Sequence, residues 1–158
     1  MVVGGAVKEI PNIIGILVKI LFMATAGYSG TPLIKKLGLK PSYKVWLIHP
    51  PDGYSQWLGE DISPQLCSSR ETPDWVHLFA ASASILHKEM TRLRVVYEKN
   101  TQLVIWVSWY KKSSRIATDL TETHVRDYGL EQGLVDIKVC AVSEEWSGLK
   151  FVVPVNKR

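Results

Sequence analysis

Cysteine is scarce in this chain of 158 residues, which contains only Cys67 and Cys140. The two lie far apart and lack the Cys-x-x-Cys spacing of redox pairs and zinc sites, so no disulfide framework is expected. The four histidines also lack the spacing typical of metal ligands. The sequence therefore predicts no structural metal.

A glycine-rich nucleotide-binding loop and a complete catalytic motif are also missing. After the first predicted strand, residues 49–53 supply one glycine and two prolines. Proline removes a backbone N–H donor and stiffens the turn, whereas dinucleotide and S-adenosylmethionine sites of the common type need several glycines for close backbone approach. The turn therefore disfavours such a site, and the sequence identifies no cofactor.

Neither sign of charge dominates the chain. Its 19 Lys and Arg stand against 15 Asp and Glu, which gives a net charge of +4. The excess falls in residues 35–44 and 111–115, and neither stretch is a long basic tail. Because no recognised nucleic-acid motif accompanies them, solvated surface is the better interpretation, and we expect no nucleic-acid partner.

An apolar stretch near the amino terminus is too short for a membrane span. A spanning helix needs about 20 mostly apolar residues, and Lys19 interrupts the run at residues 13–22. Two interpretations remain. Residues 24–26 have the small-x-small form of a signal cleavage site, which would make the protein an exported one. Alternatively, translation starts at Met23 and residues 1–22 are an extension, which we prefer for a cytoplasmic protein.

Residues 23–158 are predicted to form one α/β domain, because their length suits a single core. Apolar runs bounded by turn residues indicate buried strands, and a run with apolar steps of three and four indicates a helix at residues 85–97. The strands are predicted at residues 43–48, 75–80, 103–109, 135–141 and 149–155. Their alternation with helices predicts a compact Rossmann-like three-layer sandwich with a mainly parallel sheet and a carboxyl-terminal antiparallel hairpin.

Ligands of such sheets usually bind beyond the carboxyl ends of the strands, and one loop there carries suitable groups. Lys111, Lys112 and Ser113 follow the central strand, and Thr118 and Asp119 precede a helix. Cations, hydroxyls and free backbone N–H groups could converge there on a small anion. The alternative is that the lysines are solvated and that the threonine and aspartate only cap and staple the loop.

Three other residues near the same edge are candidates for the ligand site. His49 ends the first strand beside Asp52, which makes the two a candidate acid and base pair or simply a turn. Trp146 in the hairpin turn could form an aromatic wall for a ligand, or it could pack on its own domain, as large aromatic side chains usually do.

Several motifs give the chain a family resemblance. They occur at residues 26–33, 35–38, 109–113, 117–122 and 133–149. With them the chain closely resembles the bacterial domain-of-unknown-function family 3052 over about residues 24–153. The resemblance implies a small cytoplasmic protein that starts near Met23. Tyr110 departs from the family pattern, in which proline is more frequent at this position. The family resemblance therefore does not predict the conformation of the loop that follows.

The family has no agreed function, so the resemblance implies a fold more than an activity. A looser similarity links the order of strands to the carboxyl-terminal half of class I methyltransferases. We therefore expect a noncatalytic domain that binds a small anionic ligand at the strand-end crevice. The alternatives are a divergent methyltransferase-like enzyme that uses the same crevice and a protein-interaction module without a ligand, and no membrane partner is expected.

Overall fold

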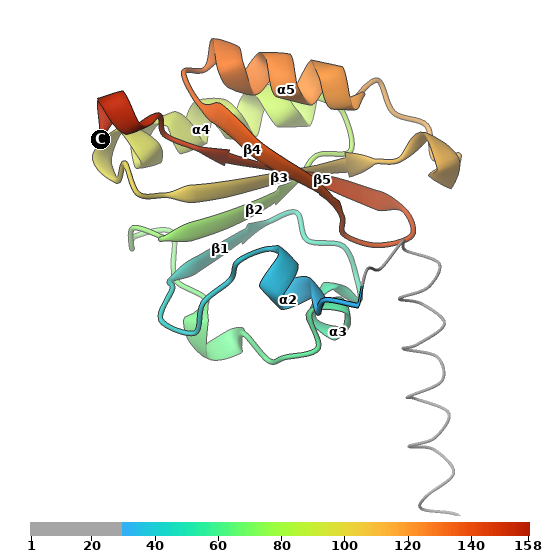
Figure 1. Cartoon of the computed structure of the whole chain (residues 1–158), viewed down its shortest axis with the longest axis horizontal. Helices are drawn as coiled ribbons and strands as arrows, with labels where there is room; N and C mark the ends of the chain where they lie inside the picture. Colours follow the sequence, from blue (N-terminus) through green and yellow to red (C-terminus); the bar gives the residue numbers. More distant parts are fainter. Residues whose placement is uncertain (1–29) are drawn as a thin grey trace, which may run out of the picture.

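The structure, a computed structural model, describes residues 30–158. The predictions for residues 1–22, for the cleavage site at 24–26 and for a start at Met23 lie outside the described residues. Helices lie on both faces of one sheet, with α4 and α5 above it and α2 and α3 below it in the view of Figure 1. Across residues 30–158, no helix is long and apolar enough to cross a membrane.

The sheet has five strands in the order β1-β2-β3-β5-β4. Their bounds are Val45–Ile48 (β1), Trp75–Phe79 (β2), Val104–Tyr110 (β3), Val135–Ala141 (β4) and Trp146–Val152 (β5). The β1–β2 and β2–β3 pairs are parallel, and the β3–β5 and β4–β5 pairs are antiparallel.

The prediction of a mainly parallel, Rossmann-like sandwich is therefore wrong: the sheet is mixed, with as many antiparallel as parallel pairs. The reason is the order of the last two strands. After α5 the chain forms β4 at the outer edge and then turns back, so that β5 fills the place beside β3. A strand that returns through a tight hairpin runs antiparallel to its predecessor, and here it also runs antiparallel to β3.

The helices differ in length on the two faces. The face shared by α4 (Ala83–Lys99) and α5 (Glu122–Glu131) has the long helices, and α2 (Leu33–Lys36) and α3 (Tyr54–Leu58) on the other face are single turns. Ser82 caps α4 by accepting a hydrogen bond from the N–H of Ile85. Short 3-10 turns complete the chain at Ser63–Gln65, Lys112–Ser114 and Val155–Lys157.

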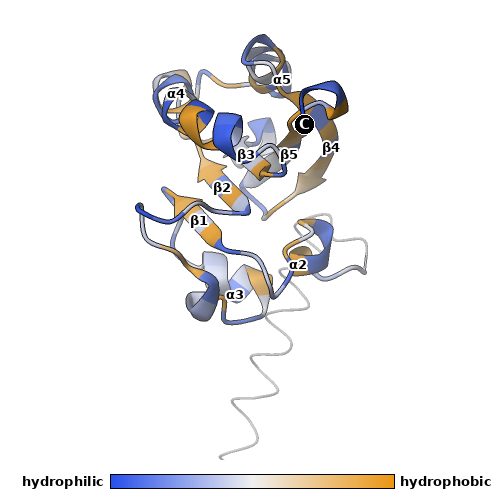
Figure 2. Ribbon diagram, turned by 90° about the vertical axis from the view of Figure 1, so that its left-hand side faces the viewer, coloured by the Kyte–Doolittle hydropathy of each residue, from blue (hydrophilic) through white to orange (hydrophobic). Residues whose placement is uncertain are grey.

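Strand alternation gives the two faces different cores, and Figure 2 shows the apolar strands between the helices. The core under α4 and α5 is mainly aliphatic, and the core above α2 and α3 is rich in aromatic side chains. Trp75 and Trp106 from neighbouring strands both donate an indole N–H to the carbonyl of Leu37, at 3.2 and 2.8 Å. These two bonds hold the end of α2 against the sheet.

Candidate ligand-binding groove

A groove of about 680 Å³ lies between the edge strand β1 and helix α4. Its lining is mostly apolar and includes Trp46 and Ile48 from β1 and Val96 from α4. The groove is open because β1 is only partly covered on this face, and the side chains of Leu66 and Val95 are 48% and 55% exposed. Ligand pockets for small molecules usually measure about 300 to 1,000 Å³, so the size is suitable.

The groove has a polar end at the carboxyl end of β1, built around Glu89 of α4. Glu89 is only 2% exposed, and it is the one buried carboxylate within residues 30–158. One carboxylate oxygen lies 3.2 Å from Nε2 of His49, and the other accepts a hydrogen bond of 2.7 Å from Arg92. Burying a carboxylate is costly unless it is paired, so these two contacts hold the charge in place.

His49 reaches Glu89 through an unusual backbone conformation. Its φ angle is +54°, in the left-handed region that few residues other than glycine adopt. Such outliers occur often at functional sites, where the surrounding structure maintains them. If Nε2 donates to Glu89, Nδ1 of the exposed ring is left as an acceptor.

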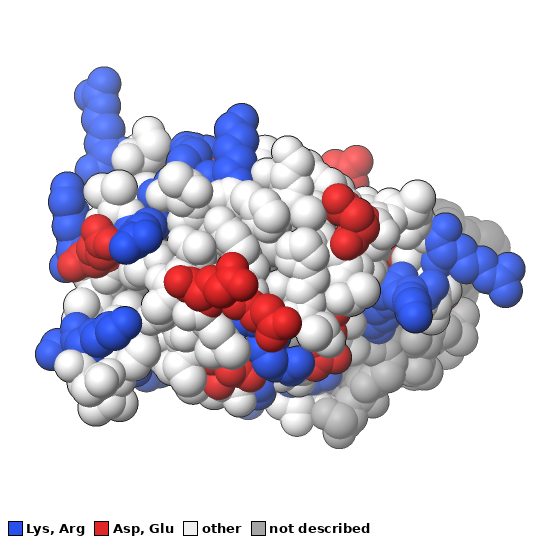
Figure 3. Space-filling model, turned by 90° about the horizontal axis from the view of Figure 1, so that it is seen from above, with Lys and Arg blue, Asp and Glu red and all other residues white. Residues whose placement is uncertain are grey.

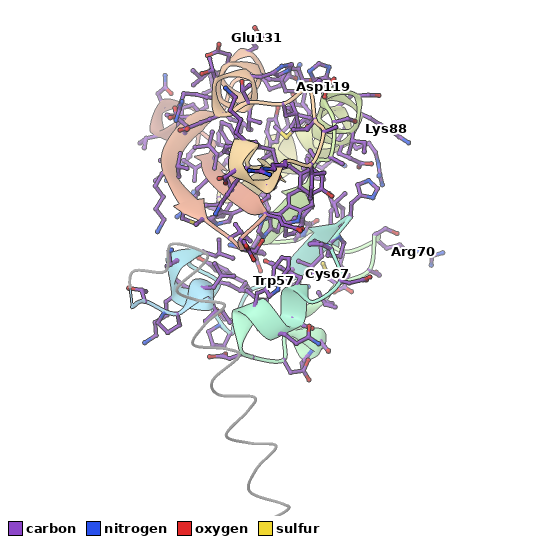
Figure 4. The ribbon with its side chains drawn as sticks, turned by 90° about the vertical axis from the view of Figure 1, so that its right-hand side faces the viewer. Trp57, Cys67, Arg70, Lys88, Asp119 and Glu131 are labelled. Atoms are coloured by element: carbon purple, nitrogen blue, oxygen red, sulfur yellow. The ribbon has the colours of Figure 1, made fainter. Side chains whose placement is uncertain are left out.

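Cationic side chains stand at both ends of the groove. A second hollow of about 170 Å³ continues the groove past Trp46, Val95 and Val96, and its charged lining residues are Arg70, Lys99 and Glu71. Figure 4 shows Arg70 on the loop outside β1, with its side chain reaching away from the ribbon. Because α4 runs against the direction of β1, these cations lie at the opposite end from Arg92.

The predicted anion site after β3 has a different character, because the structure uses its lysine internally. The Lys111 ammonium donates a hydrogen bond of 2.7 Å to the carbonyl of Ser143 in the β4–β5 turn. Burial, followed by the nearby charge of Lys36, lowers the pKa of Lys111. Lys112 and Ser113 are exposed in the 3-10 turn that follows.

Thr118 and Asp119 staple the loop before α5 to the start of α4. The Thr118 hydroxyl donates to the carbonyl of Ala81 at 2.9 Å, and the Asp119 carboxylate accepts from the N–H of Ala83 at 2.8 Å. The backbone N–H of Ala83, which an anionic ligand would use, is thus already bound by a carboxylate of the protein. The arrangement matches the stapling alternative, and Thr121 caps α5 itself.

The remaining candidates separate in space. Asp52 is exposed in the turn after β1, and the partner of His49 is Glu89 instead. Trp146 is the first residue of β5, not part of the turn, and is only 4% exposed. Its ring packs on Tyr110 and Phe79, with centroids 4.0 and 5.1 Å away, so it belongs to the core.

A buried polar chain crosses the aromatic core. The Tyr54 hydroxyl lies 2.6 Å from Nδ1 of His77, and the Ser108 hydroxyl lies 2.7 Å from Nε2. Burial lowers the pKa of His77 to about 3, so the ring is neutral at physiological pH. A neutral imidazole has one donor and one acceptor, so one hydroxyl donates to the ring and the other accepts from it. All three side chains are buried, which makes the chain structural.

The sequence contains one overlooked signal for the groove. Glu89 occurs on the apolar face of the predicted helix, three residues after Leu86 and four before Leu93. A carboxylate at such a position has to find a partner inside the fold. Comparison of the chain with protein-family models, curated proteins and solved structures gives no match. The resemblance to family 3052 thus stays a prediction, and function is inferred from the groove.

Proposed function

We propose that this chain is a noncatalytic domain that binds a small anionic ligand with an apolar body in the groove between β1 and α4. The observation that carries the proposal is the polar end of the groove, where buried Glu89 holds two exposed basic side chains, His49 and Arg92, beside an apolar channel. The polar end lies at the carboxyl end of a strand, where the sequence favours a ligand site. Its residues differ from those of the predicted site in the loop after β3.

Unused hydrogen-bond donors at the polar end favour an anion. Arg92 contributes only one of its terminal nitrogens to Glu89, and its side chain is 66% exposed. The rest of the guanidinium can form a two-pronged contact with a carboxylate, sulfonate or phosphate. His49 contacts the other carboxylate oxygen of Glu89 and lines the same end of the groove.

The apolar lining favours a ligand with a hydrocarbon or aromatic body. Trp46, Ile48 and Val96 stay partly exposed in the groove, and Leu66 and Val95 are more exposed still. Covering apolar surface stabilises a complex by about 25 cal/mol per Å² before the cost of association. A purely polar anion would not use this surface.

Fluorescence titration with anilinonaphthalene sulfonate, an aromatic anion of suitable size, tests the proposal. Arg92→Gln should weaken binding of this dye roughly tenfold or more, as expected for the loss of a charge-assisted hydrogen bond. The uncharged dye phenylnaphthylamine, which has the same aromatic body, should bind the variant and the native protein equally. Lys112→Gln, at the loop after β3, is the matched control and should change neither affinity.

Three results would contradict the proposal. Equal loss of both dyes in Arg92→Gln would mean that the variant disturbs the groove without any contact to the anion. Loss of the sulfonate dye in Lys112→Gln, with Arg92→Gln unaffected, would place the anion site after β3. If neither dye binds the native protein, the interaction module without a ligand becomes the better hypothesis.

An enzyme is the second candidate, and the His49–Glu89 pair favours it. A carboxylate that orients an imidazole beside a groove is an arrangement suited to a general base. A base of this kind could serve a hydrolase or the methyltransferase-like enzyme. Hydrolysis of nitrophenyl esters that disappears in His49→Gln, while the uncharged dye still binds, would support the enzyme. Equal activity in both proteins would reject His49 as the base.

Family and compartment belong to the proposal as well. We infer a cytoplasmic member of family 3052. Cys67 and Cys140 are free thiols, which supports a reducing compartment. Cell fractionation tests the compartment, and recovery of the protein among exported proteins would contradict it.

A further inference from the structure

Two histidines from different helices meet on the surface between α4 and α5. Nε2 of His87 lies 3.3 Å from Nε2 of His124, and the ring centroids are 5.5 Å apart with the planes tilted by 30°. The residues are 37 positions apart in the sequence, so no local spacing could reveal the pair. Neither histidine lines the groove, so the pair is independent of the proposed function.

The separation of the two nitrogens suits a shared metal ion. A zinc ion binds imidazole nitrogen at about 2.0 to 2.1 Å with tetrahedral angles, which puts two such nitrogens about 3.3 Å apart. His87 and His124 already have this separation. A direct hydrogen bond between neutral rings has a similar length, and a metal ion would replace that one bond with two bonds to nitrogen.

The surroundings of the pair orient the rings and favour a cation. His87 stacks on Tyr128 with centroids 4.2 Å apart, which limits the rotation of its ring. The hollow of about 520 Å³ next to the pair is lined by Asp127 and Glu131. Figure 3 shows acidic side chains over the middle of the face formed by these helices, with most Lys and Arg toward its margins.

Two positive charges near the pair would repel a cation, but the effect of each is reduced. Lys88 follows His87 on α4, but Figure 4 shows its side chain reaching away from the helix. The positive end of the α5 dipole lies near His124, and Glu122 in the first turn of that helix offsets it. The carboxylates of Asp127 and Glu131 in the hollow therefore favour a cation at the pair.

We propose that His87 and His124 are the protein ligands of a surface site for a divalent metal ion of the zinc class. Within residues 30–158, no three His, Cys, Asp or Glu side chains already form a metal cluster. Water would therefore complete the coordination, with Asp127 and Glu131 acting through their charge. Such a site differs from the structural metal that the sequence argues against, because it would join only two side chains on the surface.

Calorimetric titration of the full chain with zinc, after treatment with a chelator and without a histidine tag, tests the site. We expect one zinc ion per chain in the native protein and no binding of magnesium, which prefers oxygen ligands. His87→Gln and His124→Gln should each weaken zinc binding by roughly tenfold or more, since even the loss of an outer-shell partner costs that much. His49→Gln is the matched control and should bind zinc like the native protein.

Glutamine keeps a polar surface side chain, and equal thermal melting would show that each variant is folded. In the native protein, zinc should also shift the imidazole NMR signals of His87 and His124 and leave those of buried His77 unchanged. Zinc binding that survives when His87→Gln and His124→Gln are combined would overturn the proposal. Loss of zinc binding in His49→Gln instead, or its absence from the native protein, would also overturn it.

Discussion

Two parts of the strand-end edge have similar residues but different capacities for a ligand. The loop after β3 and the polar end of the groove each contain basic side chains and a carboxylate. In the loop, Lys111 and Asp119 are used by the turn carbonyl and the start of α4. At the groove, Glu89 is buried and paired, and its two partners remain more than half exposed. The type of residue therefore indicates a site poorly. The better indicator is whether its hydrogen-bonding groups remain free after the protein has folded.

His77 is the extreme case of a polar group used by the fold, and its removal should have the largest effect. His77→Leu leaves the hydroxyls of Tyr54 and Ser108 buried without their shared partner. Each unpaired group costs about 1 to 3 kcal/mol, so the free energy of unfolding should fall by roughly 3 kcal/mol or more. Urea denaturation at neutral pH measures the change.

The matched control replaces the whole polar chain, with Tyr54→Phe, His77→Leu and Ser108→Ala together. Because all three members become apolar, most of the lost stability should return. If the triple variant is less stable than His77→Leu alone, the three groups do not act as one network.

The same imidazole should make stability depend on pH. Its pKa falls from 6.5 to about 3 on folding, because burial disfavours the charged ring. Between these values the unfolded chain binds a proton that the folded chain does not. Stability should therefore decrease as pH falls from about 6.5 toward 3, by up to about 1.4 kcal/mol per pH unit from this group. Urea denaturation across this range should show a shallower slope in the triple variant, and equal slopes would contradict the assignment.

Asp119 should give a smaller effect, confined to stability. Asp119→Ala removes the acceptor for the Ala83 N–H at the start of α4 and should cost about 1 kcal/mol, as the loss of a capping group does. Asp119→Asn keeps an acceptor oxygen and should retain most of the stability. Thermal melting measures both variants. Binding of the sulfonate dye should be unchanged in both, and a clear change in affinity would return the loop after β3 to the candidate site.

The local features of the fold could be predicted from the sequence, because local patterns encode them. Apolar runs indicated β1, β2 and β3, and apolar steps of three and four indicated α4. The order of the last two strands could not be predicted, because nothing in residues 135–152 says which strand of a hairpin pairs with β3. The hairpin turn was also predicted too long, extending to residue 148, which left Trp146 outside its strand.

The candidate site depended still more on tertiary structure. His49 was selected by its position at the end of β1, but its partner Glu89 lies 40 residues further along the chain. The bonds of Lys111 and Asp119 to Ser143 and Ala83 likewise join segments that only the fold brings together. Sequence patterns propose residues of the right chemistry, and long-range contacts decide which of them remain available.

Chemical-shift mapping by amide NMR tests most directly whether the groove, and not the loop after β3, takes the ligand. On titration with anilinonaphthalene sulfonate, we expect the largest shifts in the segments that contain the groove's lining, residues 46–50, 66–69 and 89–96. The amides of residues 110–119 and 143–146 should move little. The reverse pattern, with the largest shifts in those two segments, would contradict the account.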